Sequence, residues 1–251
     1  MGHTQLLSAR TSPHRRGLLL RLGALRAAAG VATATILGLT VFCASSAAAG
    51  VTAACTARPY AYAGLVANAY RPGIKATIAA TKPADVKNGH VAGWIGVGGP
   101  KAGPNGTAEW LQAGLNVVAD GSAEIYSEQT TPGQSPVYTT LGKVVVGKAY
   151  RIAVVEISDR PGTWHVLLNG KVVSPPVSLP GSHDAFQPMA MTESWNGNVP
   201  SCNDFSYRFA DVMVGGNGSW TGLTAGSAQT LSDLGYRVAM TDAGFVAGRS
   251  V

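Results

Sequence analysis

The sequence predicts an all-β protein that folds as an antiparallel sandwich or barrel. Short runs rich in β-branched residues alternate with Asn-Gly, Asp-Gly and Pro-Gly turn pairs, and glycine is abundant at 32 of 251 residues. Apolar stripes at helical spacing are scarce, whereas period-two alternation recurs along the chain. About 200 residues can bury one such core, so a single domain over residues 50–251 is expected.

Eleven segments carry the strand pattern, each bounded by turn-forming residues. They are Tyr60–Ala69, Gly73–Ala80, His90–Val97, Glu109–Ala119, Ser122–Glu128, Lys143–Ile157, Thr163–Leu168, Lys171–Val177, Gln187–Ser194, Ser206–Val214 and Tyr236–Met240.

Two hairpins are signalled most clearly. Asn169-Gly170 and Asp120-Gly121 each offer the positive backbone angles that a type I′ turn needs. The Gly/Ser/Thr-rich segment 215–226 is expected to cross the surface before a closing strand.

Residues 1–49 differ from the rest and indicate an export signal. They hold five arginines without an acidic residue, then an apolar stretch from Ala27 to Val41, then Ala47-Ala48-Ala49 as a cleavage signature. Arg15-Arg16 is typical of twin-arginine export. We therefore expect a secreted, extracellular protein without stable membrane association, and a retained N-terminal anchor is the less favoured alternative.

The basic charge belongs to the signal. Of 19 basic and 13 acidic residues, residues 1–49 hold 5 basic ones, so the remainder has a net charge of +1. Nothing favours a nucleic-acid partner. With Cys43 in the signal, the two remaining cysteines, Cys55 and Cys202, are expected to form one disulfide in an exported chain. No spaced His/Cys motif predicts a metal, and a monomer is expected.

Alternation along two strands predicts a ligand-lining face. In the segment that begins at Glu109, the residues Trp110, Gln112, Gly114 and Asn116 share one side, and an apolar set takes the other. Trp94 likewise shares a side with small residues. Two tryptophans on small-residue faces favour a ligand groove. A second packing layer is the open alternative.

These residues resemble a family of secreted glutamic peptidases, the eqolisins. The resemblance is carried by Gly93-Trp94-Ile95-Gly96-Val97, Leu111-Gln112-Ala113-Gly114, Tyr126-Ser127-Glu128, Thr192-Glu193-Ser194-Trp195 and Phe205–Val214, in that order. It implies a concanavalin-A-like β-sandwich (jelly roll) and a polypeptide substrate.

The resemblance also implies a catalytic dyad of Gln112 and Glu193. Glu193 would take the proton of an attacking water and return it to the leaving amine. The Gln112 amide would place the water and stabilise the oxyanion. Trp94, Trp110, Tyr126 and Glu128 are expected to line the substrate. This chemistry needs no cofactor, and the family implies an acidic optimum.

Three other classes stay open at this stage. Glu124 and Glu128, with Tyr126 between them, resemble the acid motif of sandwich-fold β-glucanases. A lectin-like binding module using Asn196-Gly197-Asn198 and Asp204 is a second alternative, because fold does not decide function. Serine-triad chemistry has the least support, with His165 and the pair His183-Asp184 as the only bases considered.

Overall fold

The computed structural model describes residues 58–216, 218–233 and 235–251, all within one structural unit, Cys43–Val251. The predicted export signal and Cys55 lie outside the described residues. The expected disulfide to Cys202 therefore stays a prediction.

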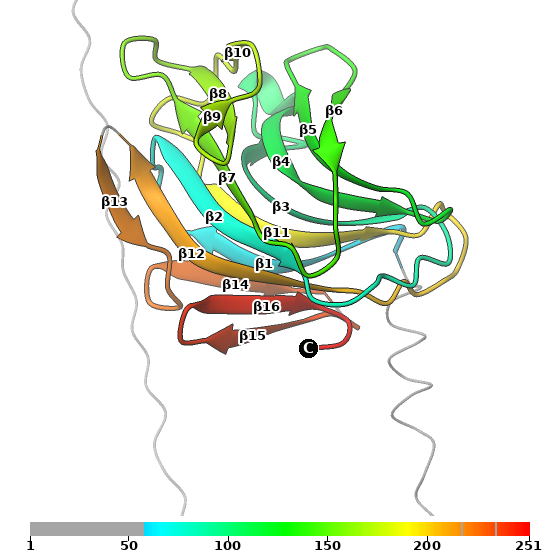
Figure 1. Cartoon of the computed structure of the whole chain (residues 1–251). Helices are drawn as coiled ribbons and strands as arrows, with labels where there is room; N and C mark the ends of the chain where they lie inside the picture. The colour runs from blue at the N-terminus through cyan, green and yellow to red at the C-terminus, as the bar shows by residue number, and fades with distance from the viewer. Residues whose placement is uncertain (1–57, 217, 234) are drawn as a thin grey trace, which may run out of the picture. The chain divides into compact units, whose positions relative to one another are not determined.

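The described chain is all-β and forms two antiparallel sheets, which confirms the predicted sandwich class (Figure 1). One sheet is seven-stranded, in the order β14-β1-β11-β3-β4-β5-β6. Its strands are β1 (Tyr60–Ala67), β3 (His90–Gly99), β4 (Glu109–Val118), β5 (Ala123–Thr130), β6 (Val137–Lys143), β11 (Pro188–Trp195) and β14 (Ala228–Ser232), and a short 3₁₀ turn, η1 (Pro104–Gly106), precedes β4.

The second sheet is nine-stranded, with the main order β10-β8-β7-β2-β12-β16-β15. Two short strands lie off this path, β13 beside β12 and β9 beside β8. The strands are β2 (Gly73–Ala80), β7 (Tyr150–Glu156), β8 (Thr163–Leu168), β9 (Lys171–Val172), β10 (Val177–Ser178), β12 (Ser206–Gly216), β13 (Ser219–Gly222), β15 (Arg237–Thr241) and β16 (Gly244–Gly248).

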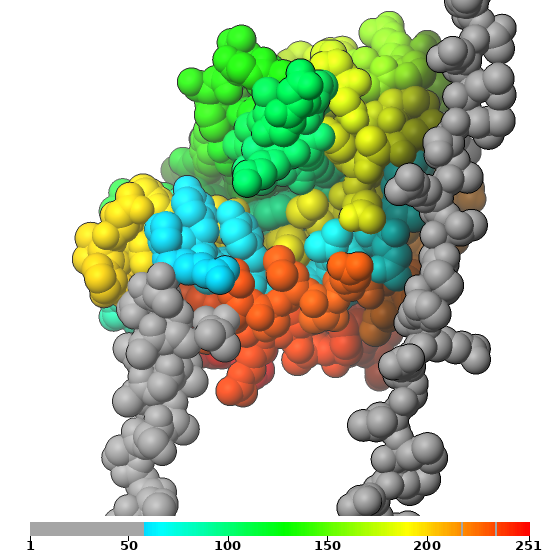
Figure 2. All heavy atoms as spheres, turned by 180° about the vertical axis from the view of Figure 1, so that it is seen from behind, coloured from blue at the N-terminus to red at the C-terminus, as the bar shows by residue number. Residues whose placement is uncertain are grey.

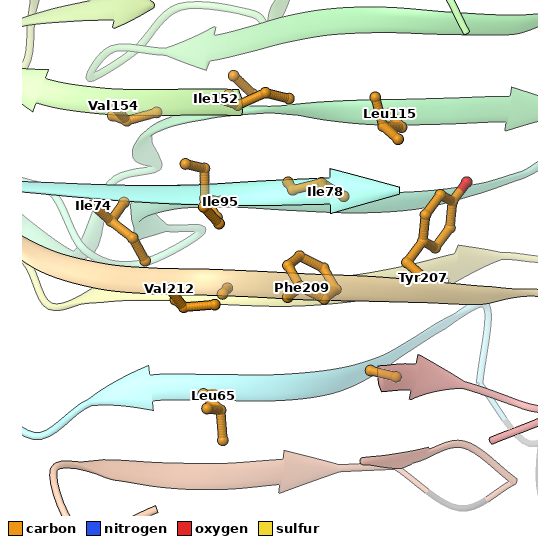
Figure 3. Close-up of a cluster of buried hydrophobic side chains, with 14 of the residues drawn as sticks. Leu65, Ile74, Ile78, Ile95, Leu115, Ile152, Val154, Tyr207, Phe209 and Val212 are labelled. Atoms are coloured by element: carbon orange, nitrogen blue, oxygen red, sulfur yellow. The ribbon is translucent and has the colours of Figure 1, made fainter. Parts of the chain in front are cut away.

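The core lies between the two sheets and is built from every second residue of each strand. Leu65, Ile95 and Leu115 enter it from the seven-stranded sheet, and Ile78 and Phe209 enter it from the nine-stranded sheet (Figure 3). All five side chains are fully buried. Burial at about 25 cal/mol per Å² of apolar surface makes this layer the main source of stability. It also fixes which side chains of each strand face outward.

Both predicted hairpins form, but only one uses the predicted turn. Asn169 and Gly170 have φ of 52° and 82°, as a type I′ turn requires. At the other hairpin only Gly121 has a positive φ, of 85°, and its amide donates to the Val118 carbonyl. That pattern is a type I turn followed by a left-handed glycine, so the type I′ prediction for Asp120-Gly121 was wrong.

Several predicted strand boundaries were also wrong. The single strand expected over Lys143–Ile157 is interrupted by a turn at Gly147, whose φ is 79°, so β6 ends at Lys143 and β7 begins at Tyr150. The strand expected over Lys171–Val177 breaks at Pro175-Pro176, because proline has no amide hydrogen for the ladder. The segment 215–226 contains strand β13, paired with β12, and strands β14 and β16 were not expected.

Candidate active site

The outer face of the seven-stranded sheet carries a second apolar layer. Trp94, Tyr126, Met191 and Ala92 form a buried cluster that is separate from the core, with Tyr62, Val66 and Met189 packed against it. Seen from behind, the surface over this sheet is hollowed between green segments above and cyan and orange segments below (Figure 2). The predicted face therefore exists, and Trp94 has a packing role in it.

Gly114 sets the position of Trp94. The two residues are opposite one another on β4 and β3. A Cβ at Gly114 would lie 2.2 Å from the Gly93 carbonyl oxygen and 2.6 Å from the Trp94 Cβ. Only glycine leaves this space open, so the indole can lie across the sheet.

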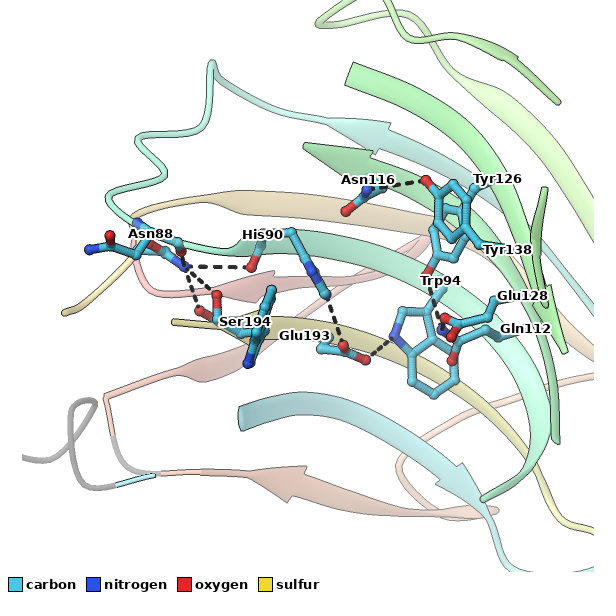
Figure 4. Close-up of polar contacts among 12 residues, drawn as sticks. Asn88, His90, Trp94, Gln112, Asn116, Tyr126, Glu128, Tyr138, Glu193 and Ser194 are labelled. Atoms are coloured by element: carbon cyan, nitrogen blue, oxygen red, sulfur yellow. Dashed lines mark hydrogen bonds and ion pairs between the residues drawn. The ribbon is translucent and has the colours of Figure 1, made fainter. Parts of the chain in front are cut away.

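Glu193 reaches this layer from β11 and is 8% exposed. One carboxylate oxygen is 3.1 Å from the His90 Nε2, and the other accepts a hydrogen bond of 3.2 Å from the Trp94 indole N–H (Figure 4). A buried carboxylate needs such partners, because desolvating an unpaired charge is costly. Glu193 is therefore fixed by its partners His90 and Trp94 and is not a solvated carboxylate at the end of a strand.

Gln112 is held by a different carboxylate. It lies opposite Glu128 in the β4–β5 hairpin, and its Nε2 donates to the Glu128 carboxylate at 3.1 Å. The same nitrogen lies 3.2 Å from the Tyr126 hydroxyl. Gln112, Tyr126 and Glu128 thus form one local group, and two of them were expected only as substrate-lining residues.

The structure does not place Gln112 in direct contact with Glu193. Gln112 is opposite Gly96, which is opposite Met189, so Glu193 lies four residues further along β11. Strand geometry then offsets the two backbones by about 13 Å along the strands and about 10 Å across them. The Trp94 indole lies between the two side chains (Figure 4).

The carboxylates of Glu128 and Glu193 nevertheless influence one another electrostatically. Burial raises the pKa of Glu128, and the negative charge of Glu193 raises it further, whereas His90 and the Gln112 hydrogen bond oppose the shift. Burial and the same two carboxylates raise the pKa of Tyr126. Glu128 is thus biased toward its neutral, proton-donating form.

Aromatic side chains extend the site beyond the predicted residues. Tyr138 of β6 stacks on Tyr126 with ring centroids 5.1 Å apart, and its hydroxyl accepts a hydrogen bond of 3.1 Å from Asn116. His90 tilts against Trp195 at 5.5 Å. The strand alternation that placed Trp94 also places His90 on this face, so His90 was accessible from the sequence.

Trp110 stands apart from these groups. It is opposite Gly98 on one side and Thr130 on the other, at the beginning of β4, and is half-buried. It belongs to the same face, as the alternation predicted, but it lies outside the apolar cluster around Trp94.

The residues of the glucanase alternative share a face without meeting. Glu124 accepts hydrogen bonds from Thr140 at 2.8 Å and from Tyr138 at 3.4 Å, while Glu128 is engaged with Gln112. Their backbones are about 13 Å apart along β5, and Tyr126 lies between them in the sequence. This spacing favours separate environments for the two carboxylates.

The residues considered for a lectin-like site have structural partners. Asn196 is buried, and its side-chain oxygen accepts a hydrogen bond of 3.0 Å from the Asn198 amide, as in a local turn. Asp204 forms an ion pair of 2.7 Å with Lys82 and accepts a hydrogen bond of 2.6 Å from Ser250. These contacts account for the side chains of Asn196 and Asp204 without a ligand.

The histidines considered for a triad are engaged elsewhere. His183 lies 2.9 Å from the buried carboxylate of Glu156 and 3.5 Å from its sequence neighbour Asp184. The Tyr70 hydroxyl also donates to Glu156. His165 lies on β8, as expected for a strand residue. The sequence neighbours His183 and Asp184 do form a local pair.

The described residues lack two features that would indicate a metal centre or a membrane-spanning helix. No group of three or more His, Cys, Asp or Glu side chains there is arranged to hold a metal ion. Within those same ranges, no helix has the length and apolar character needed to cross a membrane.

Comparison with solved structures identifies similar folds. A scytalido-glutamic peptidase with a transition-state analogue inhibitor matches with a TM-score of 0.53 and 15% identity, over 76% of this chain and 98% of that one. SCP-B, a member of the eqolisin family in complex with the tripeptide Ala-Ile-His, matches with a TM-score of 0.51 and 15% identity, over 76% and 98%. No family model and no curated protein matches the sequence. The likeness shows a peptidase-like fold.

Proposed function

We propose that this protein is a secreted glutamic-type endopeptidase that works on polypeptides at the outer face of the seven-stranded sheet. The observation that carries the proposal is the arrangement around Trp94. The Glu193 carboxylate accepts a hydrogen bond from the Trp94 indole, and beyond the indole the Gln112 amide donates to Glu128, a carboxylate with a raised pKa. The structural neighbours, which include a peptidase with a bound transition-state analogue, support it.

The two carboxylates suit different steps of amide hydrolysis. One oxygen of Glu193 accepts a hydrogen bond from the Trp94 indole, and the other lies 3.1 Å from the His90 Nε2, an arrangement that suits a general base that takes a proton from water. Glu128 has a raised pKa, which suits a general acid that donates a proton to the leaving amine. Gln112, beside Glu128, would donate to the carbonyl oxygen as it becomes negative.

The spacing of these groups is compatible with that division. A general base is hydrogen-bonded to the attacking water at about 3 Å, and the water oxygen lies about 3 Å from the carbonyl carbon. A general acid is in turn hydrogen-bonded to the leaving nitrogen at about 3 Å. The base and the acid should therefore lie apart rather than in contact. Glu193 and Glu128 lie on either side of Trp94, so they are not in contact, and the charge of Glu193 still acts on Glu128 (Figure 4).

The test is digestion of an unfolded protein substrate by the 251-residue chain from acidic to neutral pH. We expect activity that falls as the pH rises and Glu128 loses its proton. Glu193→Gln and Glu128→Gln should each lower kcat by a factor on the order of 10² or more, and Gln112→Ala by about 10².

Glu124→Gln is the matched control, because it changes a carboxylate on the same strand face without touching Gln112. It should keep peptidase activity. Equal activity in the wild type and the three site variants would refute the proposal. Activity on a β-glucan that Glu124→Gln or Glu128→Gln abolishes would instead identify a glycosidase. Binding to a polysaccharide matrix with no hydrolysis would identify a binding module.

A further inference from the structure

A second concavity lies on the opposite side of the sandwich, over the outer face of the nine-stranded sheet. Its cavity volume is about 470 Å³, and its floor is formed by β2, β7 and β12. Trp220 of β13 forms one wall, and the Asn169-Gly170 turn forms the other. These strands lie side by side in Figure 1. The volume is within the range of small-ligand sites.

Two cations line this groove without an ionic partner. Lys75 and Arg151 are diagonal neighbours on β2 and β7. Among the described residues, neither takes part in a salt bridge, whereas Lys82 and Lys87 do. The ammonium of Lys75 is 4.2 Å from the centre of the Trp220 ring. Cation and indole thus form one joint surface.

The groove also offers neutral and accepting groups. Thr77 and Asn169 line it, and a bulge in β12 brings Asp211 to its rim with a φ of 51°. Such a mixture can bind hydroxyl groups as donors and as acceptors. The floor residue opposite Lys75 is Ala153, whose small side chain leaves room above the sheet.

The floor does not offer a free strand edge. β2 is paired on both sides, with β7 and β12, and β7 is paired with β2 and β8. An extended peptide therefore cannot join the sheet here through backbone hydrogen bonds. Recognition must come from side chains, which favours a ligand with its own hydroxyl and carboxylate groups.

We propose that this groove binds an acidic saccharide whose sugar units carry carboxylates. The planar fork of Arg151 suits a planar carboxylate. Lys75 adds a second positive charge, and the half-buried Trp220 indole beside it offers apolar contact to a sugar ring. The groove lies on the other sheet from the proposed peptidase site, so saccharide binding here does not depend on whether the protein is a peptidase.

The test is calorimetric titration of the full chain with a trimer of galacturonic acid, with the methyl ester of the same trimer as the uncharged comparison. We expect the acid to bind, its affinity to fall as NaCl is added, and the ester to bind at least 10-fold more weakly. The double variant K75Q/R151Q should lose on the order of 10-fold or more in affinity.

Arg208→Gln is the matched control, because Arg208 is an exposed cation on the same sheet outside the groove. It should bind like the wild type, and thermal unfolding should show that all variants fold. Absence of binding, equal binding of acid and ester, or an equal loss in Arg208→Gln would overturn the proposal. Equally tight binding of a poly-glutamate peptide, with the same sensitivity to K75Q/R151Q, would reassign the groove to acidic peptides.

Discussion

The two outer faces of the sandwich share one core but differ in packing and in charge. The face of the seven-stranded sheet is covered by its own apolar layer around Trp94, and its charged groups include the carboxylates Glu124, Glu128 and Glu193. The face of the nine-stranded sheet is open, and it presents the cations Lys75 and Arg151. A packed layer holds side chains in fixed positions, as catalysis requires. An open face leaves charges free to meet a ligand.

The largest expected effect tests the packing difference with tryptophan. Trp94→Ala removes a side chain that is 6% exposed and also removes the indole donor to Glu193, so it should cost about 3–5 kcal/mol in urea unfolding. Trp220→Ala, on the open face, should cost about 1 kcal/mol. Similar losses at both positions would show that the two faces are packed alike.

A second comparison adds atoms instead of removing them. Gly114→Ala places a Cβ 2.2 Å from the Gly93 carbonyl oxygen, so we expect about 2–3 kcal/mol of destabilisation and a displaced Trp94. Ala153→Val, on the groove floor, should change stability by less than about 0.5 kcal/mol, because it meets open space. The measurement is the urea midpoint of unfolding of each variant. An unchanged midpoint for Gly114→Ala would contradict the close packing of Trp94 against residue 114.

The smallest expected effect concerns pH. The pKa of Glu128 is raised in the folded protein, so its neutral form is favoured there. The stability that this group contributes is full below the ordinary glutamate pKa and is lost as the pH rises through the raised value. In Glu128→Gln the side chain cannot ionise, so the variant avoids the cost of a charge at this buried position. Its Tm should exceed that of the wild type by about 2 °C at neutral pH, and the difference should vanish in acid.

Lys75→Gln is the control for that measurement, because it alters charge on the other face. Its Tm difference from the wild type should show no such acid-to-neutral trend. A pH-independent difference for Glu128→Gln would mean that Glu128 is as well solvated as a surface glutamate.

Local pattern predicted the sheet faces well, because strand alternation has a fixed period of two. It placed Trp94 and Gln112 outward, as observed. The contact between Gln112 and Glu128 was also within reach, since a hairpin centred on Asp120 brings these two residues level. The family resemblance pointed instead to a pairing of Gln112 with Glu193.

Other features depended on tertiary structure. The neighbours of Glu193 come from β3, about a hundred residues earlier in the chain, and no local pattern specifies that pairing. Tyr138 lies on β6, an edge strand with polar residues on both faces, so its alternation is weak. The apolar run Val144–Val146 hid the turn at Gly147 and merged two strands into one.

The hydrogen bond between the Trp94 indole and Glu193 gives the proposed site an optical reporter. Indole emission responds to the field and the polarity around the ring. A substrate or inhibitor that displaces the Glu193 carboxylate from that N–H should therefore shift the fluorescence of Trp94. Occupancy of this face would then be visible in the unmodified protein, without a label and before any bond is cleaved.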